Sequence, residues 1–177
     1  MTRTAAPEFS RLVPLGRLRM EPFRQKITAT AAERADLTRR FGLLALDRLS
    51  ATVELARRGE DMFLLRAAFS AEFVQSCVVT LDPVGGAVSE EFTLLYGPPE
   101  METQAGQTVE DEIAFEPLVG TAIDIGEAVA QQFSLVLPPF PRSPGATIDA
   151  EAPPADDSGP LAAALSRLAD RRGEPPR

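Results

Sequence analysis

Residues Met62–Tyr96, MFLLRAAFSAEFVQSCVVTLDPVGGAVSEEFTLLY, decide the fold because they hold three runs in which apolar residues alternate with others. In the first run every second residue from Phe63 to Phe73 is apolar, so these side chains can share one face of a β-strand. A shorter run follows over Cys77–Leu81, and a third spans Val88–Tyr96, where Glu90 interrupts the apolar row. The stretch therefore predicts three consecutive strands.

The residues between the second and third runs, Asp82-Pro83-Val84-Gly85-Gly86, are typical of a hairpin turn. Pro83 presets φ, and the two glycines tolerate the positive φ that such a turn needs. We therefore expect the strands to form an antiparallel meander.

Three further strands are predicted upstream, at Glu8–Leu15, Pro22–Ala29 and Leu49–Leu55. The last of these should pair with the strand at Met62–Phe73 through a turn at Arg57–Asp61. Because two arginines stand beside two acids in that turn, a local solvated ion pair is the default interpretation, and a phosphate contact is the alternative.

Two helices are predicted by their caps and their apolar spacing. Thr30-Ala31-Ala32-Glu33 is a capping-box pattern that opens a helix over Ala31–Phe41, and Gly42 is a typical C-terminal stop. The second helix begins after Asp124 and ends before Pro138-Pro139, because proline cannot continue a helix.

These patterns predict an α+β fold, an antiparallel β-meander sheet covered by two helices. Residues 1–141 are expected to form a single domain. Residues 138–177 hold nine of the sixteen prolines, which predicts a flexible linker at 142–158. A short amphipathic helix and tail should follow at 159–177, and the helix could dock on its own domain or on a partner.

The central stretch FVQSCVVTLDPVGGAVSEEFTLLY resembles the centre of the YceD family of bacterial and plastid proteins. Other segments follow the order of the family pattern, so the resemblance covers roughly residues 40–170. They are Glu91-Phe92, Asp111-Glu112-Ile113, Asp124-Ile125-Gly126-Glu127, Leu135-Val136-Leu137-Pro138 and Gly159-Pro160-Leu161-Ala162.

The resemblance implies a non-enzymatic ribosome-biogenesis factor that supports accumulation or processing of large-subunit (23S) ribosomal RNA. Such a factor would bind RNA or a pre-ribosomal particle in the cytoplasm. From the residues alone we expect no membrane span, because no apolar run approaches the roughly 18 residues that one needs. No cofactor is expected either.

The absence of histidine excludes a Ser-His-Asp or Cys-His catalytic arrangement and any His-based zinc site. Many YceD-like proteins have a Cys-x-x-Cys pair, but here the position three residues after Cys77 is Thr80. We therefore expect no metal site. In a strand Cys77 would share a face with Val79 and Leu81, which predicts a buried small hydrophobe.

The net charge of −8 is distributed unevenly along the chain. Residues 1–48 carry a net +5, residues 49–116 a net −10 and residues 117–177 a net −3. An ordinary solvated surface could explain this, but a polyanion would be attracted to the first segment. The candidate RNA contacts are Arg17, Arg19, Arg24, Lys26, Arg39, Arg40, Arg57 and Arg58.

The acidic residues of the Gly97–Phe115 stretch and its flank support an alternative function. Clustered carboxylates can hold magnesium or serve a hydrolase, but adjacent residues of an extended segment point to opposite faces, so a solvated loop is favoured. The alternative is therefore a protein–protein adaptor that binds a basic partner such as a ribosomal protein. Its candidate contacts are Glu110, Asp111, Glu112 and Glu116.

Overall fold

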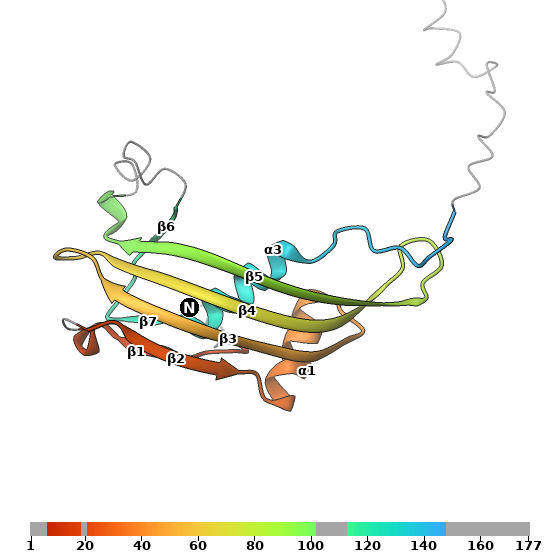
Figure 1. Cartoon of the computed structure of the whole chain (residues 1–177), viewed down its shortest axis with the longest axis horizontal. Helices are drawn as coiled ribbons and strands as arrows, with labels where there is room; N and C mark the ends of the chain where they lie inside the picture. Colours follow the sequence, from red (N-terminus) through yellow and green to blue (C-terminus); the bar gives the residue numbers. More distant parts are fainter. Residues whose placement is uncertain (1–6, 19–20, 102–112, 148–177) are drawn as a thin grey trace, which may run out of the picture. The chain divides into compact units, whose positions relative to one another are not determined.

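The computed structural model describes residues 7–18, 21–101 and 113–147 and has an α+β architecture, as expected (Figure 1). Residues Met1–Ala146 form one compact unit, and a second unit spans Thr147–Arg177. Among the described residues, no helix has the length and apolar character needed to cross a membrane.

The main sheet has five strands in the order β2-β3-β4-β5-β6. Their bounds are β2 Phe23–Thr28, β3 Ala45–Arg57, β4 Phe63–Ser76, β5 Pro83–Gly97 and β6 Ala114–Pro117. Neighbours from β2 to β5 are antiparallel, but β6 runs parallel to β5. The sheet is therefore mixed, because a strand forms at the end of the stretch that the sequence analysis assigns to an acidic loop.

The two helices have the expected caps. Helix α1 spans Ala31–Phe41 with a complete capping box from Thr30, and Gly42 closes it at φ 64°. Helix α3 spans Ile125–Val136, and the Asp124 carboxylate accepts hydrogen bonds from the backbone N–H groups of Gly126 and Glu127. Both caps confirm the predicted helix starts.

Phe133 of α3 lies at the centre of the core. Its ring makes edge contacts with Phe41 of α1 and with Phe69 and Phe73 of β4, at centroid distances of 5.7, 6.4 and 5.6 Å. Leu37 of α1 belongs to the same buried cluster. Both helices therefore pack against one face of the sheet, here called the helix face (Figure 1). Residues that alternate with these point to the opposite side, here called the outer face.

A second, two-stranded sheet pairs β1, Leu12–Pro14, with β7, Ala122–Asp124. Single turns of 3-10 helix follow β1 at Leu15–Arg17 and β5 at Pro99–Met101. The strand expected over Glu8–Leu15 is thus too long, because β7 offers only three pairing residues.

The predicted strand at Cys77–Leu81 is wrong, because these residues form the turn between β4 and β5. Leu81 supplies the positive φ of this turn, at 65°. Gly85 and Gly86, expected in a turn, lie within β5 instead. The Phe73 ring explains why position 86 is a glycine, since a Cβ atom on Gly86 would lie 2.7 Å from that ring.

Candidate nucleic-acid interface

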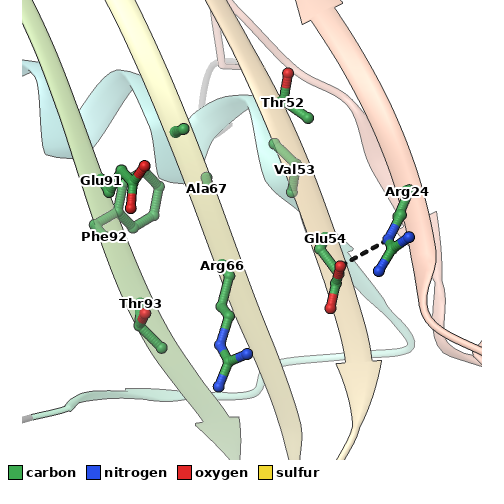
Figure 2. Close-up of a pocket in the computed structure, with 10 residues that line it drawn as sticks. Arg24, Thr52, Val53, Glu54, Arg66, Ala67, Glu91, Phe92 and Thr93 are labelled. Atoms are coloured by element: carbon green, nitrogen blue, oxygen red, sulfur yellow. Dashed lines mark hydrogen bonds and ion pairs between the residues drawn. The ribbon is translucent and has the colours of Figure 1, made fainter.

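The outer face of the sheet carries two neighbouring cross-strand rows of polar side chains. In one row Arg24 of β2 lies opposite Glu54 of β3, which lies opposite Arg66 of β4. In the next row Lys26 lies opposite Thr52. Figure 2 shows how Arg24, Glu54 and Arg66 stand side by side over a shallow hollow of this face.

Some cations of the outer face form ion pairs and others do not. Arg24 Nε donates to Glu54 Oε2 at 2.7 Å, and Arg48 Nη1 lies 3.5 Å from Glu72 Oε1. Within the described residues, Lys26 and Arg66 form no ion pair, and both are exposed. These two cations can therefore attract an anion without first breaking a contact.

Small polar side chains make this face low in relief. Thr28, Ser50, Ser70 and Ser89 form one continuous row across β2–β5. The hydroxyl oxygens of Ser50 and Ser70 lie 3.2 Å apart. The alternation places every aromatic residue of β2–β5 on the helix face, and Phe115 of β6, opposite Leu95, stands on the outer-face side at the far end of the sheet. The polar rows of β2–β5 therefore offer no ring on which a base could stack. Contact with a nucleic acid here would be with phosphates and sugars.

Arg48 and Arg66 belong to this surface as well, although neither is among the cations predicted from the sequence. Both lie outside or at the end of the basic first segment, so a selection by segment charge passes over them. The signal is present in the alternation, because Arg66 stands between the inward-facing Leu65 and Ala67 and must point to the other face.

The other predicted cations do not lie on the outer face. Arg40 lies among the helices, where its guanidinium contacts Glu127 at 2.7 and 2.8 Å and Glu8 at 2.9 Å. Hydrogen bonding to Glu127 raises the pKa of Arg40 above its already high value. Arg39 is exposed and pairs with Asp36 in the same helix. Arg40 is exposed, as expected, but its ion pairs connect three segments of the fold, so it is not a free cation.

The remaining candidates lie near the end of the β3–β4 hairpin or outside the described residues. Arg57 lies over the Phe63 ring at 5.7 Å and donates to the backbone carbonyls of Gly59 and Glu60. The local ion pair expected for Arg57 is therefore replaced by bonds to the backbone of the turn. Arg58 is in the same turn, Arg17 ends the first 3-10 turn, and Arg19 lies outside the described residues.

Of the acidic candidates, only Glu116 falls within the described residues. It lies half-buried in β6, opposite Tyr96 of β5. Burial, and to a lesser extent the charge of Glu116, raise the pKa of Tyr96. Glu110, Asp111 and Glu112 lie outside the described residues, so the adaptor hypothesis stays a prediction.

Cys77 is buried, as expected, but its surroundings are polar rather than apolar. Its Sγ accepts hydrogen bonds from the hydroxyl and the backbone N–H of Ser143, both at 3.3 Å, and from the backbone N–H groups of Val79 and Thr80, both at 3.4 Å. The Ser143 hydroxyl is the first cause that lowers the pKa of the thiol to about 6. The described part of the chain has no group of three or more metal-ligating residues.

One of three comparisons with known proteins identifies a family. A family model described as the large ribosomal RNA subunit accumulation protein YceD matches residues 65–165, more than half of the chain. No curated protein and no solved structure matched. The matched segment contains all but the first two residues of β4, together with β5, β6, β7 and α3, and therefore most of the sheet and the helix at the centre of its core. The chain belongs to the YceD family.

Proposed function

We propose that this protein supports the accumulation of large-subunit ribosomal RNA by contacting RNA through the outer face of its sheet, without catalysing a reaction and in the cytoplasm. The family description supplies the link to ribosomal RNA. The observation that carries the proposed contact is the pair of exposed cations, Lys26 and Arg66, which have no ion-pair partner among the described residues.

The geometry of this surface supports contact with the RNA backbone. Lys26 and Arg66 lie on strands two positions apart, so their backbones are separated by roughly 10 Å across the sheet. On the intervening strand β3, Thr52 lies opposite Lys26 and Glu54 lies opposite Arg66. The short Thr52 side chain leaves room for a phosphate chain to approach, and the Glu54 carboxylate is already paired with Arg24. The helix layer offers fewer free cations to an RNA backbone, because Arg11 and Arg40 there form ion pairs with carboxylates.

The test is RNA binding by the double variant Lys26→Ala/Arg66→Ala over a series of salt concentrations. Each phosphate contact adds roughly 0.7 to 0.9 to the salt slope, so losing two contacts should lower the slope by about 1.5 and weaken binding at low salt. The melting temperature should change little, because exposed charges contribute little to stability.

The matched control is Arg17→Ala/Arg39→Ala, which removes the same charge from exposed positions away from the outer face. It should leave the salt slope within about 0.5 of the wild-type value. A slope that falls equally in both variants would mean that RNA responds only to net charge. An unchanged slope in the Lys26/Arg66 variant would remove the outer face as the contact surface. Arg40 is kept in both variants because its loss would also disturb packing.

The cellular test uses the same two variants in place of the wild-type protein. The Lys26/Arg66 variant should lower the amount of large-subunit ribosomal RNA relative to small-subunit RNA, and the Arg17/Arg39 variant should not. Equal protein levels in the two strains are the required control.

A further inference from the structure

Strand β5 lies at the border of the sheet over most of its length (Figure 1). It spans 15 residues, but β6 pairs only with its last four, Leu94–Gly97. Over Pro83–Thr93 the strand pairs with β4 on one side, and no described strand pairs with the other side. An edge of this length presents a row of backbone groups that can pair with another strand.

The hydrogen bonds at the two ends of β5 define which backbone groups face outward. Gly97 O accepts from Leu118 N at 2.7 Å, on the β6 side. Asp82 O, just before the strand, accepts from Cys77 N at 2.8 Å, on the β4 side. Because successive residues of a strand direct their N–H and C=O groups to opposite sides, both observations assign the outward direction to the odd-numbered residues. The outward N–H groups are those of Gly85, Ala87, Ser89, Glu91 and Thr93.

Two acidic side chains stand at the middle of this edge, one on each face of the sheet. Glu90 lies opposite Phe69 and is therefore on the helix face, and Glu91 lies opposite Ala68 on the outer face. Both are exposed, and neither forms an ion pair within the described part of the chain. The edge therefore presents two negative charges, above and below the same row of backbone groups.

These charges decide which strand can add to the edge. A second copy of β5 would bring carboxylates toward carboxylates, and an inward-pointing charge on an edge strand is a known obstacle to such self-pairing. A strand with two adjacent basic residues has the opposite effect, because adjacent side chains point to opposite faces. One cation would reach Glu90 and the other Glu91.

We propose that the free edge of β5, at Gly85–Thr93, binds an extended basic segment of a partner protein as an additional β-strand. Backbone hydrogen bonds to the outward groups give the segment its direction and register, and a pair of adjacent Lys or Arg residues at the level of Glu90 and Glu91 gives it specificity. This inference goes beyond the proposed RNA contact and does not depend on it, because it concerns a protein ligand paired to the backbone of the sheet edge, which adjoins the outer face at Glu91.

The first test measures amide hydrogen exchange of the full chain with the blocked peptide Thr-Val-Thr-Lys-Lys-Thr-Val-Thr. In the protein alone, the amides of Ala87, Ser89 and Glu91 should exchange fast, whereas those of Val88 and Glu90 are protected by β4. Saturating peptide should slow the exchange of the three outward amides by about ten-fold or more and leave the other two unchanged. The same peptide with Glu-Glu in place of Lys-Lys, or with N-methyl groups on alternate residues, should bind at least about five-fold more weakly.

The second test uses variants of the edge. Ala87→Pro removes one outward N–H that bonds to no described strand, so the fold should tolerate it and peptide affinity should fall by about five-fold or more. Glu90→Gln/Glu91→Gln should weaken binding by about two- to ten-fold and abolish the preference for Lys-Lys over Glu-Glu. Glu60→Gln/Glu100→Gln removes the same charge from exposed positions off the edge and should leave affinity within about two-fold.

Several results would overturn the proposal. If the outward amides are already protected without peptide, the edge is occupied by the chain itself, or by a second copy where protection rises with protein concentration. If the acidic or N-methylated peptide binds as well as the basic one, the edge does not pair by strand addition to a basic segment. If RNA, and not the peptide, slows these three amides, the edge is part of the RNA surface. If Ala87→Pro does not fold, the N-methylated peptide and the hydrogen-exchange data still test whether the edge binds a strand.

Discussion

The two faces of the main sheet use charge in different ways. On the helix face, Arg11 donates to Glu33 at 2.6 and 3.1 Å, and Arg40 is held by Glu8 and Glu127. Asp124 accepts from Ser10 Oγ at 2.5 Å and from Arg11 N at 2.7 Å while it caps α3. On the outer face, by contrast, Lys26 and Arg66 stand exposed without an ion pair among the described residues.

The difference follows from what each face must do. The helix face has to fasten the N-terminal segment and two helices onto the sheet, and partly buried charges there need partners. Gly126 shows how closely these segments approach, since a Cβ atom would lie 2.3 Å from the Phe9 carbonyl oxygen. The outer face packs against no described helix, so Lys26 and Arg66, which have no ion-pair partner among the described residues, are available to a ligand. Whether a basic residue of the first segment is structural or available therefore depends on its ion-pair partners as well as on its face, since Arg24 on the outer face is paired with Glu54.

The largest expected effect compares the packing of the two faces. Phe133→Ala removes the ring that contacts three others in the core and should lower the free energy of unfolding by about 3–5 kcal/mol. Thr52→Ala on the outer face should cost less than about 1 kcal/mol. Chemical denaturation measures both. Similar losses in the two variants would contradict the assignment of a single packed face.

The next effect is a pH dependence confined to the helix face. Hydrogen bonding to Arg11 lowers the pKa of Glu33 from 4.5 to about 2. A carboxylate whose pKa is lowered by folding stabilises the protein above its unfolded pKa, and this stabilisation is lost as the pH falls from about 4.5 to about 2. The pKa difference corresponds to at most about 3 kcal/mol, and partial exposure reduces it to about 1–2 kcal/mol.

Glu33→Gln isolates this contribution, because glutamine keeps the capping box but removes the charge. At neutral pH the variant should be less stable than the wild type by about 1–2 kcal/mol, and the two should converge near pH ~2. The measurement is the free energy of unfolding at several pH values. A gap that stays constant with pH would mean that the pair with Arg11 carries no charge-dependent stability.

The sequence alone predicts most of the local structure of both faces, because its signals are local. Alternation from Phe63 to Phe73 predicts β4, and the patterns at Thr30 and Asp124 predict where the helices begin. What cannot be read locally is pairing at a distance. Ala114–Pro117 forms a strand because β5 offers a partner, and the strand predicted over Glu8–Leu15 is limited to Leu12–Pro14 because β7 offers three pairing residues.

The same distinction between local patterns and long-range pairing explains which residues of the candidate site can be predicted from the sequence. Alternation is sufficient to predict that Arg24 and Lys26 share a face. The position of Arg66 beside them can be known only from the register of β2, β3 and β4. The ion pairs of Arg40 with Glu8 and Glu127 join residues that are 32 and 87 positions apart in the sequence, so no local pattern predicts them. Net charge by segment contains neither fact.

A smaller effect separates two neighbouring arginines of α1. Arg40→Ala leaves the carboxylates of Glu8 and Glu127 without their shared cation, which should cost about 1–2 kcal/mol. Arg39→Ala removes the same charge from the same helical turn but breaks only an exposed pair with Asp36, so the cost should be below about 0.5 kcal/mol. Thermal or chemical denaturation of the two variants provides the comparison. An equal cost would show that the Arg40 contacts add nothing to stability in solution.

The smallest effect concerns Cys77, which lies in the turn beyond the end of β4, where neither face of the sheet defines its surroundings. Hydrogen bonds from Ser143 and from the backbone of the turn favour the thiolate, so the thiol should titrate with a pKa of about 6 instead of the ordinary value of 9.0. Because the chain has one cysteine, the ultraviolet absorbance of the thiolate as a function of pH reports this residue alone.

Ser143→Ala removes the hydroxyl donor and should move the pKa of Cys77 back toward the ordinary value, whereas Ser89→Ala on the outer face should not move it. Alkylation of the native protein should remain slow in spite of the ionised sulfur, since Cys77 is fully buried. A wild-type thiol that titrates near its ordinary pKa would show that the turn does not hold the sulfur as a hydrogen-bond acceptor in solution.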